Sequence, residues 1–304
     1  MDNNKQNSIL LTSGTNEVEI VEFSIGNTIM GINVIKVKEI INPLAPVKLP
    51  NAHPCLEGII QLRKEIIPVI DLGKFLGFQP SPNPQQDKFI VSEFNQNKYA
   101  FHVHTVSRIH RISWEQIEKP SEITQSDQSS LIGIIKLAEK MILLLDFEKI
   151  MVDISPSLAN QSDAIRAMGE RTVSSKHVMI AEDSPMLRKL LLDYLPQVGY
   201  PNLTFYTDGK QALERLLKIA DEHGENFSDV VNILITDIEM PQMDGHYLTK
   251  TIKQHPILNR LPVVIFSSLI TDDLRHKGVS VGANEQISKP EYENLSHIID
   301  QLIL

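Results

Sequence analysis

Three acidic residues, a serine and a lysine stand where short predicted strands end in the second half of the chain. Glu182 and Asp183 follow the run HVMIA, and Asp237 follows ILIT. Ser267 ends the run VVIFS, and Lys289 follows EQIS. Carboxylates that lie together repel one another, and a cation is needed to keep them charged. Mg²⁺ prefers such oxygen ligands, so the pattern predicts a Mg²⁺ site at which Asp237 acts as a nucleophile toward phosphorus.

The serine and the lysine suit the same chemistry, because phosphoryl transfer depends mainly on positioning and charge neutralisation. Mg²⁺ and the ammonium group of Lys289 would neutralise phosphoryl oxygens, and the hydroxyl of Ser267 would donate a hydrogen bond to one of them. Ser184 and Pro185 are typical of a helix N-terminus, so a helix should begin directly after the acid pair. An acid at a strand end is commonly a solvated turn residue, and only the joint pattern indicates a site.

The elements that would position these residues alternate between strands and helices over residues 176–304. Each apolar run is followed by a segment with apolar residues at helical spacing, such as SPMLRKLLLDYL. Five such units predict a parallel sheet covered on both faces. Ligands of such sheets bind outside the carboxyl ends of the strands, which is where the acids, the serine and the lysine are expected.

The motifs AEDSPMLRKLL, TDIEMPQMDG, VVIFSS and SKP resemble those of response-regulator receiver domains, over about residues 176–304. The resemblance implies an α/β flavodoxin-like fold with a five-stranded parallel sheet in the order 2-1-3-4-5. It implies that Asp237 accepts a phosphoryl group from a histidine kinase, and that Ser267 and Lys289 sense that group. The Mg²⁺ ligands it implies are Glu182, Asp183, Asp237 and the backbone carbonyl of Glu239. Many receiver domains carry an aromatic residue three positions before the lysine, where this chain has Gln286.

The first half of the chain has the pattern of an all-β unit over residues 16–155. Alternating runs such as EIVEFSIG, KFIVSEF and KYAFHVHTV are separated by polar turns, which is typical of a barrel or sandwich. Hairpin turns are expected at residues 95–97 and 138–140. Helical signal is limited to VIKVKEII and DFEKIMVDI. Residues 156–175 are polar and weakly periodic, so they are predicted to be a linker.

The pattern EFSIGNTIMGINVIKVKEII, followed by LEGIIQLRKEIIPVIDLGKFLG, resembles the CheW type of chemotaxis coupling domain. That family is a pair of small β-barrels, a double barrel, which bridges chemoreceptors and the histidine kinase CheA. Its NLRG motif stands here as QLRK, so the resemblance implies that Arg63 takes part in partner binding. A coupling domain followed by a receiver domain resembles the CheV family.

Four other side chains have both a chemical and a structural interpretation. His102 and His104 share one face of a strand, as two metal ligands can, but no acid or cysteine with ligand spacing is evident nearby, so solvent-facing histidines are predicted. Trp114 is predicted to pack in the interior. Cys55 is the one cysteine; this excludes an internal disulfide and suits a reducing cytoplasm. We expect a half-buried thiol there rather than a catalytic nucleophile.

Charge and hydropathy exclude several classes of protein. Residues 1–155 contain 15 Lys and Arg against 18 Asp and Glu, and residues 156–304 contain 14 against 20. Nucleic-acid binding normally requires a basic patch, so a transcription regulator is not expected. No apolar run reaches the ~18 residues that span a bilayer, so no direct membrane insertion is expected. The N-terminal residues predict a polar leader and not a signal peptide.

We therefore expect a cytoplasmic adaptor, associated with membrane chemoreceptor arrays, that couples chemoreceptor tips to CheA and acts in adaptation. Phosphorylation of Asp237 would regulate it. The alternative is a phosphate sink for CheA that is tethered to the array. An enzyme under receiver control would need a polar catalytic cluster, and the first half shows none. The chain is expected to be a phosphoryl acceptor with slow self-dephosphorylation, because Leu269, two residues after Ser267, cannot orient a water.

Overall fold

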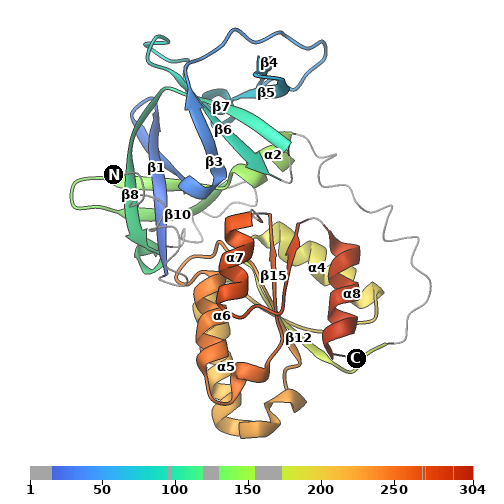
Figure 1. Ribbon diagram of the computed structural model, residues 1–304. Helices are drawn as coiled ribbons and strands as arrows, with labels where there is room; N and C mark the ends of the chain where they lie inside the picture. Colours follow the sequence, from blue (N-terminus) through green and yellow to red (C-terminus); the bar gives the residue numbers. More distant parts are fainter. Residues whose placement is uncertain are drawn as a thin grey trace, which may run out of the picture. The chain divides into compact units, whose positions relative to one another are not determined.

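The computed structural model describes most of the chain, namely residues 16–94, 97–118, 130–154, 173–268, 270, 272–289 and 291–303. The chain divides into two compact units, Val18–Asn160 and Gln161–Leu304, the second together with Met1–Glu17 (Figure 1). Most of the predicted linker, residues 156–172, lies outside the described residues.

The N-terminal unit is all-β, as predicted, and is built from two sheets. A six-stranded sheet has the order β8-β1-β2-β11-β10-β9. Its strands are β1 (Glu17–Ile25), β2 (Thr28–Asn33), β8 (Thr105–Ser113), β9 (Ile117–Glu118), β10 (Leu131–Lys136) and β11 (Met141–Leu145). A five-stranded sheet has the order β3-β6-β7-β5-β4. Its strands are β3 (Val37–Ile41), β4 (Leu56–Leu62), β5 (Glu65–Asp71), β6 (Lys88–Phe94) and β7 (Asn97–Val103).

Both predicted hairpins are present. Strand β6 pairs with β7 in antiparallel register across residues 95–96, and β10 pairs with β11 across residues 137–140. The helical signal in VIKVKEII is mostly wrong. Only Val34–Lys36 form a short 3₁₀ helix, η1, and the rest is strand β3, which pairs with β6. The β-branched residues of this segment fit a pleated sheet surface better than a helix.

Helix α2 (Phe147–Ile154) joins the cores of the two sheets. The ring of Phe147 packs edge-on against Phe101 of β7 at a centroid distance of 4.5 Å, and against Phe23 of β1 at 6.0 Å. These three rings are fully buried, and edge-to-face contacts of this kind add to the stabilisation from burial. The remaining short helices of the described part of this unit are α1 (Leu72–Phe75) and the 3₁₀ turn η2 (Trp114–Gln116).

The C-terminal unit is a doubly wound α/β fold with the predicted parallel sheet. Its strand order, β13-β12-β14-β15-β16, is the predicted 2-1-3-4-5. The strands are β12 (His177–Ala181), β13 (Asn202–Tyr206), β14 (Ile233–Thr236), β15 (Val263–Ser267) and β16 (Glu285–Ser288). All of the neighbouring strands pair in parallel.

Helices cover both faces of this sheet (Figure 1). Helices α5 (Gly209–His223) and α6 (Gly245–Gln254) pack into one core, and α4 (Pro185–Gln197) and α8 (Tyr292–Ile303) pack into the core on the opposite face. Helix α7 (Asp272–Ser280) lies between β15 and β16 in the chain. Strand β14 is buried along its whole length, which explains its continuous apolar sequence.

Candidate functional site

The three predicted carboxylates meet at the carboxyl edge of the parallel sheet. One oxygen each of Glu182, Asp183 and Asp237 lies within 4.8 Å of the others. The sheet imposes this approach, because Ala181 at the end of β12 pairs with Thr236 at the end of β14. The amide of Asp237 continues the ladder by donating to the carbonyl of Ala181 at 2.9 Å. Residues that follow two neighbouring parallel strands are thereby brought to one place.

Lys289 follows β16, an edge strand of the sheet, and its side chain reaches the carboxylate cluster. Its ammonium group donates to Oε2 of Glu182 at 2.8 Å and to Oδ2 of Asp237 at 2.9 Å, and its side chain is only 4% exposed. Its backbone amide donates to the carbonyl of Ser267 at 3.0 Å, which extends the pairing of β15 with β16. The ammonium also lies 5.9 Å from the centre of the Phe266 ring. The lysine is therefore fixed at both its backbone and its charged end.

The cluster holds more negative charge than one lysine balances. Burial raises the pKa of Glu182 to about 7, and although the charge of Lys289 acts in the opposite direction, the charge of Asp237 raises the pKa further. A partly buried set of hard oxygen donors with surplus negative charge fits a divalent cation such as Mg²⁺. Glu182, Asp183 and Asp237 would hold the ion, and the ion would supply charge neutralisation for phosphoryl oxygens.

The loops around the cluster are held by caps and by one tight contact. Ser184 is the N-cap of α4 and Pro185 its first residue, as predicted, and Oε1 of Glu182 accepts a hydrogen bond from the Ser184 amide at 3.1 Å. After β14, Gly245 begins α6 so close to the preceding loop that an added Cβ would lie 1.9 Å from the carbonyl oxygen of Asp237. Only glycine fits there, which accounts for the final letter of the MPQMDG motif.

The other two predicted residues of the phosphoryl site are Ser267 and Glu239. Ser267 is the last residue of β15 and is buried, and Glu239, two residues after Asp237, is buried as well. Leu269 lies outside the described residues. One residue that the sequence reasoning missed is Arg188 in α4, whose guanidinium donates to the carbonyls of Glu182 and Asp183. Every residue has a main-chain carbonyl, so residue types alone do not show which carbonyls accept a hydrogen bond from an arginine.

Arg63 occupies the tip of the hairpin that joins β4 to β5. Leu62 pairs with Glu65, so Arg63 and Lys64 form a two-residue turn. Arg63 has a φ of 57°, which such tight hairpin turns require. Its side chain is 78% exposed, and its guanidinium donates to Oε2 of Glu39 at 3.2 Å. The turn therefore presents a cationic side chain at the surface of the N-terminal unit.

The prediction of a solvent-facing His102 is wrong. The imidazole is 23% exposed and lies between two carboxylates: Nδ1 is 2.6 Å from Glu57 and Nε2 is 3.0 Å from Asp87. Burial lowers the pKa of His102, but hydrogen bonds and charges of Glu57 and Asp87 outweigh burial and raise it above the ordinary value. The partners were missed because they lie 45 and 15 residues away in the chain. Nδ1 of His104 accepts a hydrogen bond from the Gly26 amide.

Trp114 and Cys55 have structural roles. Trp114 is buried in the core of the six-stranded sheet, as predicted. The Cys55 thiol is free and buried, and burial raises its pKa. Since the thiolate is the nucleophilic form, a raised pKa argues against catalysis by this residue.

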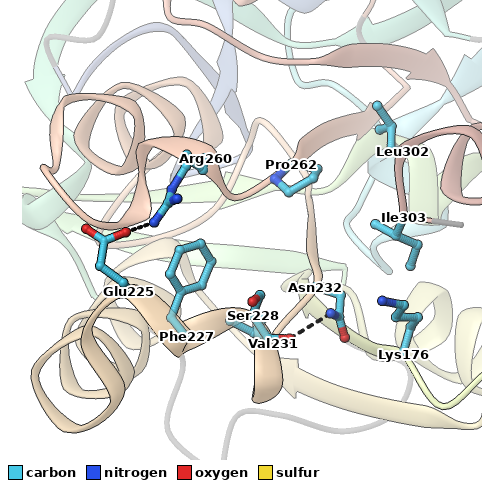
Figure 2. Close-up of a pocket in the computed structure, with 10 residues that line it drawn as sticks. All are labelled: Lys176, Glu225, Phe227, Ser228, Val231, Asn232, Arg260, Pro262, Leu302 and Ile303. Atoms are coloured by element: carbon cyan, nitrogen blue, oxygen red, sulfur yellow. Dashed lines mark hydrogen bonds and ion pairs between the residues drawn. The ribbon is translucent and has the colours of Figure 1, made fainter.

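A pocket opens at the opposite end of the parallel sheet from the acidic cluster (Figure 2). Its lining includes Lys176, Asn232 and Pro262, which precede β12, β14 and β15. In parallel strands these positions are at the edge away from Asp237. Glu225 and Arg260 on its rim form an ion pair with each other. The pocket is therefore separate from the residues that the sequence predicted to act on phosphorus.

Comparison with known proteins agrees with the two units. The CheW-like domain family matches residues 19–155, and the response regulator receiver domain family matches residues 178–300. The chain is 30% identical over 302 residues to the chemotaxis protein CheV3 of Helicobacter pylori, covering 94% of this chain and 95% of that protein. This chain belongs to the CheV family.

Solved structures resemble each half of this CheV-family chain. The scaffolding protein TtCheW from Thermoanaerobacter tengcongensis is 32% identical, with a TM-score of 0.40, and the match covers 42% of this chain and 88% of that one. A second solved structure is the receiver domain of the sensor histidine kinase PA1611 from Pseudomonas aeruginosa PAO1, which is described with a magnesium ion in its active site cleft. It is 21% identical with a TM-score of 0.36, and the match covers 43% of this chain and 98% of that one. Among the described helices, none is both long and apolar enough to cross a membrane.

Proposed function

We propose that this CheV-family protein couples chemoreceptors to the kinase CheA, and that phosphorylation of Asp237 regulates this coupling during adaptation. The observation that carries the proposal is the position of Asp237: it stands at a rigid strand end, within 4.8 Å of two further carboxylate oxygens and hydrogen-bonded to Lys289. With a bound Mg²⁺, this arrangement would neutralise the charge of a phosphoryl group at one point, and charge neutralisation is a main requirement of phosphoryl transfer.

In the proposed transfer, a carboxylate oxygen of Asp237 attacks the phosphorus of a phosphohistidine of CheA. The new O–P bond forms as the P–N bond breaks, and the imidazole leaves with the electron pair. Lys289 lies within hydrogen-bonding distance of Oδ2 of Asp237, so its ammonium is placed to bind a phosphoryl oxygen attached there. The hydroxyl of Ser267 would donate to a second oxygen, and the carbonyl of Glu239 would complete the Mg²⁺ ligands.

Coupling itself is assigned to the CheW-like domain, residues 16–155, joined by a linker over residues 156–175 to the receiver domain at 176–304. Arg63 supports this assignment, because its exposed hairpin position leaves the guanidinium accessible to a partner. The partners would be CheA and the cytoplasmic tips of chemoreceptors, which would place the protein at receptor arrays on the cytoplasmic side of the membrane.

Kinase activity measured with receptor arrays in vitro tests the proposal. Asp237→Ala should retain coupling but remove any change in receptor gain that depends on phosphorylation of this protein. A chain truncated after Ser155 should still sediment with the arrays, and Arg63→Glu should weaken its sedimentation. If deletion of residues 176–304 leaves receptor gain unchanged and only increases phosphate flow to other receiver domains, the protein is a phosphate sink.

A further inference from the structure

Arg188 connects the first turn of α4 to the strand end that carries the acid pair. Its Nη1 atom donates to the carbonyl oxygen of Glu182 at 2.7 Å and to that of Asp183 at 2.7 Å. Side chains of a helix point toward its N-terminus, so a residue at this position of α4 can reach back over the turn. One cationic side chain thus binds the main-chain carbonyls of the two residues that supply two of the three carboxylates.

These two carbonyls belong to residues that stand between β12 and α4. The helical pattern of α4 begins with the carbonyl of Ser184, which accepts from the amide of Arg188 at 3.0 Å. Strand β12 ends one residue before Glu182. The guanidinium supplies hydrogen bonds at the point where the two elements meet, and hydrogen bonds from a charged donor are the stronger kind.

Arg188 and Lys289 act on the cluster in different ways. Lys289 binds carboxylate oxygens of Glu182 and Asp237, which are the atoms that a metal ion would need. Arg188 binds main-chain oxygens and leaves the carboxylate oxygens of the acid pair to other partners. Groups that orient metal ligands in this indirect way affect metal affinity by roughly ten- to a hundredfold in other proteins.

We propose that Arg188 is a positioning residue for the divalent cation and phosphoacceptor site, holding the Glu182–Asp183 main chain in the orientation that brings both carboxylates to Asp237. This inference rests on the proposed function of the site as a Mg²⁺-dependent phosphoryl acceptor. It assigns Arg188 no contact with the ion or with the phosphoryl group.

The direction in which loss of Arg188 changes Mg²⁺ affinity distinguishes a positioning role from a purely electrostatic one. A cation near the acids repels Mg²⁺, so removal of a charge alone should strengthen Mg²⁺ binding. Loss of positioning should weaken it. Lys189, the next residue in α4, is an exposed cation, so Lys189→Met removes the same charge close to the same site and leaves the two carbonyl hydrogen bonds intact.

The test is calorimetric titration of the full-length chain with Mg²⁺, comparing wild type, Arg188→Met, Arg188→Lys and Lys189→Met. We expect roughly tenfold or greater weakening in Arg188→Met, a smaller loss in Arg188→Lys, and unchanged or slightly tighter binding in Lys189→Met. Thermal unfolding of each metal-free variant shows whether the receiver domain is folded. Arg188→Lys keeps the charge, so it remains informative if Arg188→Met does not fold.

The positioning role would be overturned if folded Arg188→Met bound Mg²⁺ as tightly as wild type or more tightly. It would also be overturned if Arg188→Met did not fold and Arg188→Lys bound Mg²⁺ with the affinity of wild type. Failure of the proposed function looks different, because wild type itself would then bind no Mg²⁺ in the titration or would carry its phosphoryl group on a residue other than Asp237.

Discussion

The ammonium nitrogen of Lys289 lies 2.9 Å from Oδ2 of Asp237, although 52 residues separate them in the chain. The same nitrogen lies 2.8 Å from Oε2 of Glu182. One buried cation therefore bridges the proposed phosphoacceptor and a proposed metal ligand. The lysine stabilises the two carboxylates, and a metal ion or a phosphoryl group would have to draw one of them away from it.

Lys289→Met should raise Mg²⁺ affinity and lower the stability of the metal-free receiver domain. Removal of the ammonium frees two carboxylate oxygens and makes the cluster more negative. Breaking a buried ion pair costs about 3 kcal/mol or more, and Mg²⁺ should restore part of this loss. Calorimetric titration and thermal unfolding with and without Mg²⁺ measure both effects. Lys218→Met, which removes a lysine with a 64% exposed side chain from α5, serves as the control and should change neither quantity appreciably.

Gly245→Ala should distort the loop that carries Asp237, the proposed phosphoacceptor. The added methyl group would overlap the main-chain carbonyl of Asp237, which is not a flexible side chain, so the loop or α6 has to move. Such overpacking typically costs about 1–3 kcal/mol, and we expect reduced phosphorylation as well as a lower free energy of unfolding.

Gly73→Ala provides a matched control for Gly245→Ala. Gly73 is also a buried helical glycine, but the nearest atom to an added Cβ there is 3.3 Å away, on the side chain of Asp71. Chemical denaturation and transfer from phosphorylated CheA should be affected far more by the first substitution than by the second. Equal effects would show that the contact with Asp237 is not the cause.

The stability of the CheW-like domain should fall as pH rises above about 6.5. The folded state raises the pKa of His102 above the ordinary value of 6.5, so the folded protein binds more protons than the unfolded chain between these two pKa values. The stabilisation that this pKa difference provides is fully present below the pKa of the unfolded chain. It is lost as the pH rises through the pKa of the folded state, at up to about 1.4 kcal/mol per pH unit. Denaturation followed by Trp114 fluorescence reports on this domain alone, because Trp114 is the one tryptophan.

Two variants test the origin of this pH dependence. His102→Leu should remove it, because no imidazolium then lies between Glu57 and Asp87. His104→Leu leaves that arrangement intact and should preserve the dependence. A pH profile of His102→Leu that superimposes on that of wild type would show that other groups are responsible.

Residues that follow strands in the receiver domain could be predicted because sheet geometry dictates their meeting. Ala181 pairs with Thr236, so a sequence-based prediction that identifies both strands as neighbours also places Glu182 and Asp183 beside Asp237. Lys289 follows from the same rule, because it comes directly after β16, two strands beyond β14 in the sheet. The parallel sheet and the helices on both faces were predicted from apolar periodicity, which is strong where a whole strand is buried, whereas the strand order came only from the resemblance to receiver domains.

The interactions that the sequence did not reveal involve groups with no fixed spacing. His102 meets one acid from β4 and another from the residue before β6, and nothing in either segment marks it as a partner. Arg188 binds main-chain oxygens, which every residue possesses. The segment VIKVKEII was misjudged because a short run of alternating β-branched residues also satisfies helical spacing, and pairing with β6 decides its structure.

The most direct test of the account is to incubate the full-length protein with phosphorylated CheA and Mg²⁺ and to map the residue that carries the label. We expect an acid-labile acyl phosphate on Asp237, formed in wild type, absent from Asp237→Ala, and dependent on Mg²⁺ through Glu182 and Asp183. Undiminished labelling of a folded Asp237→Ala variant, or a label that maps to any other residue, would contradict it.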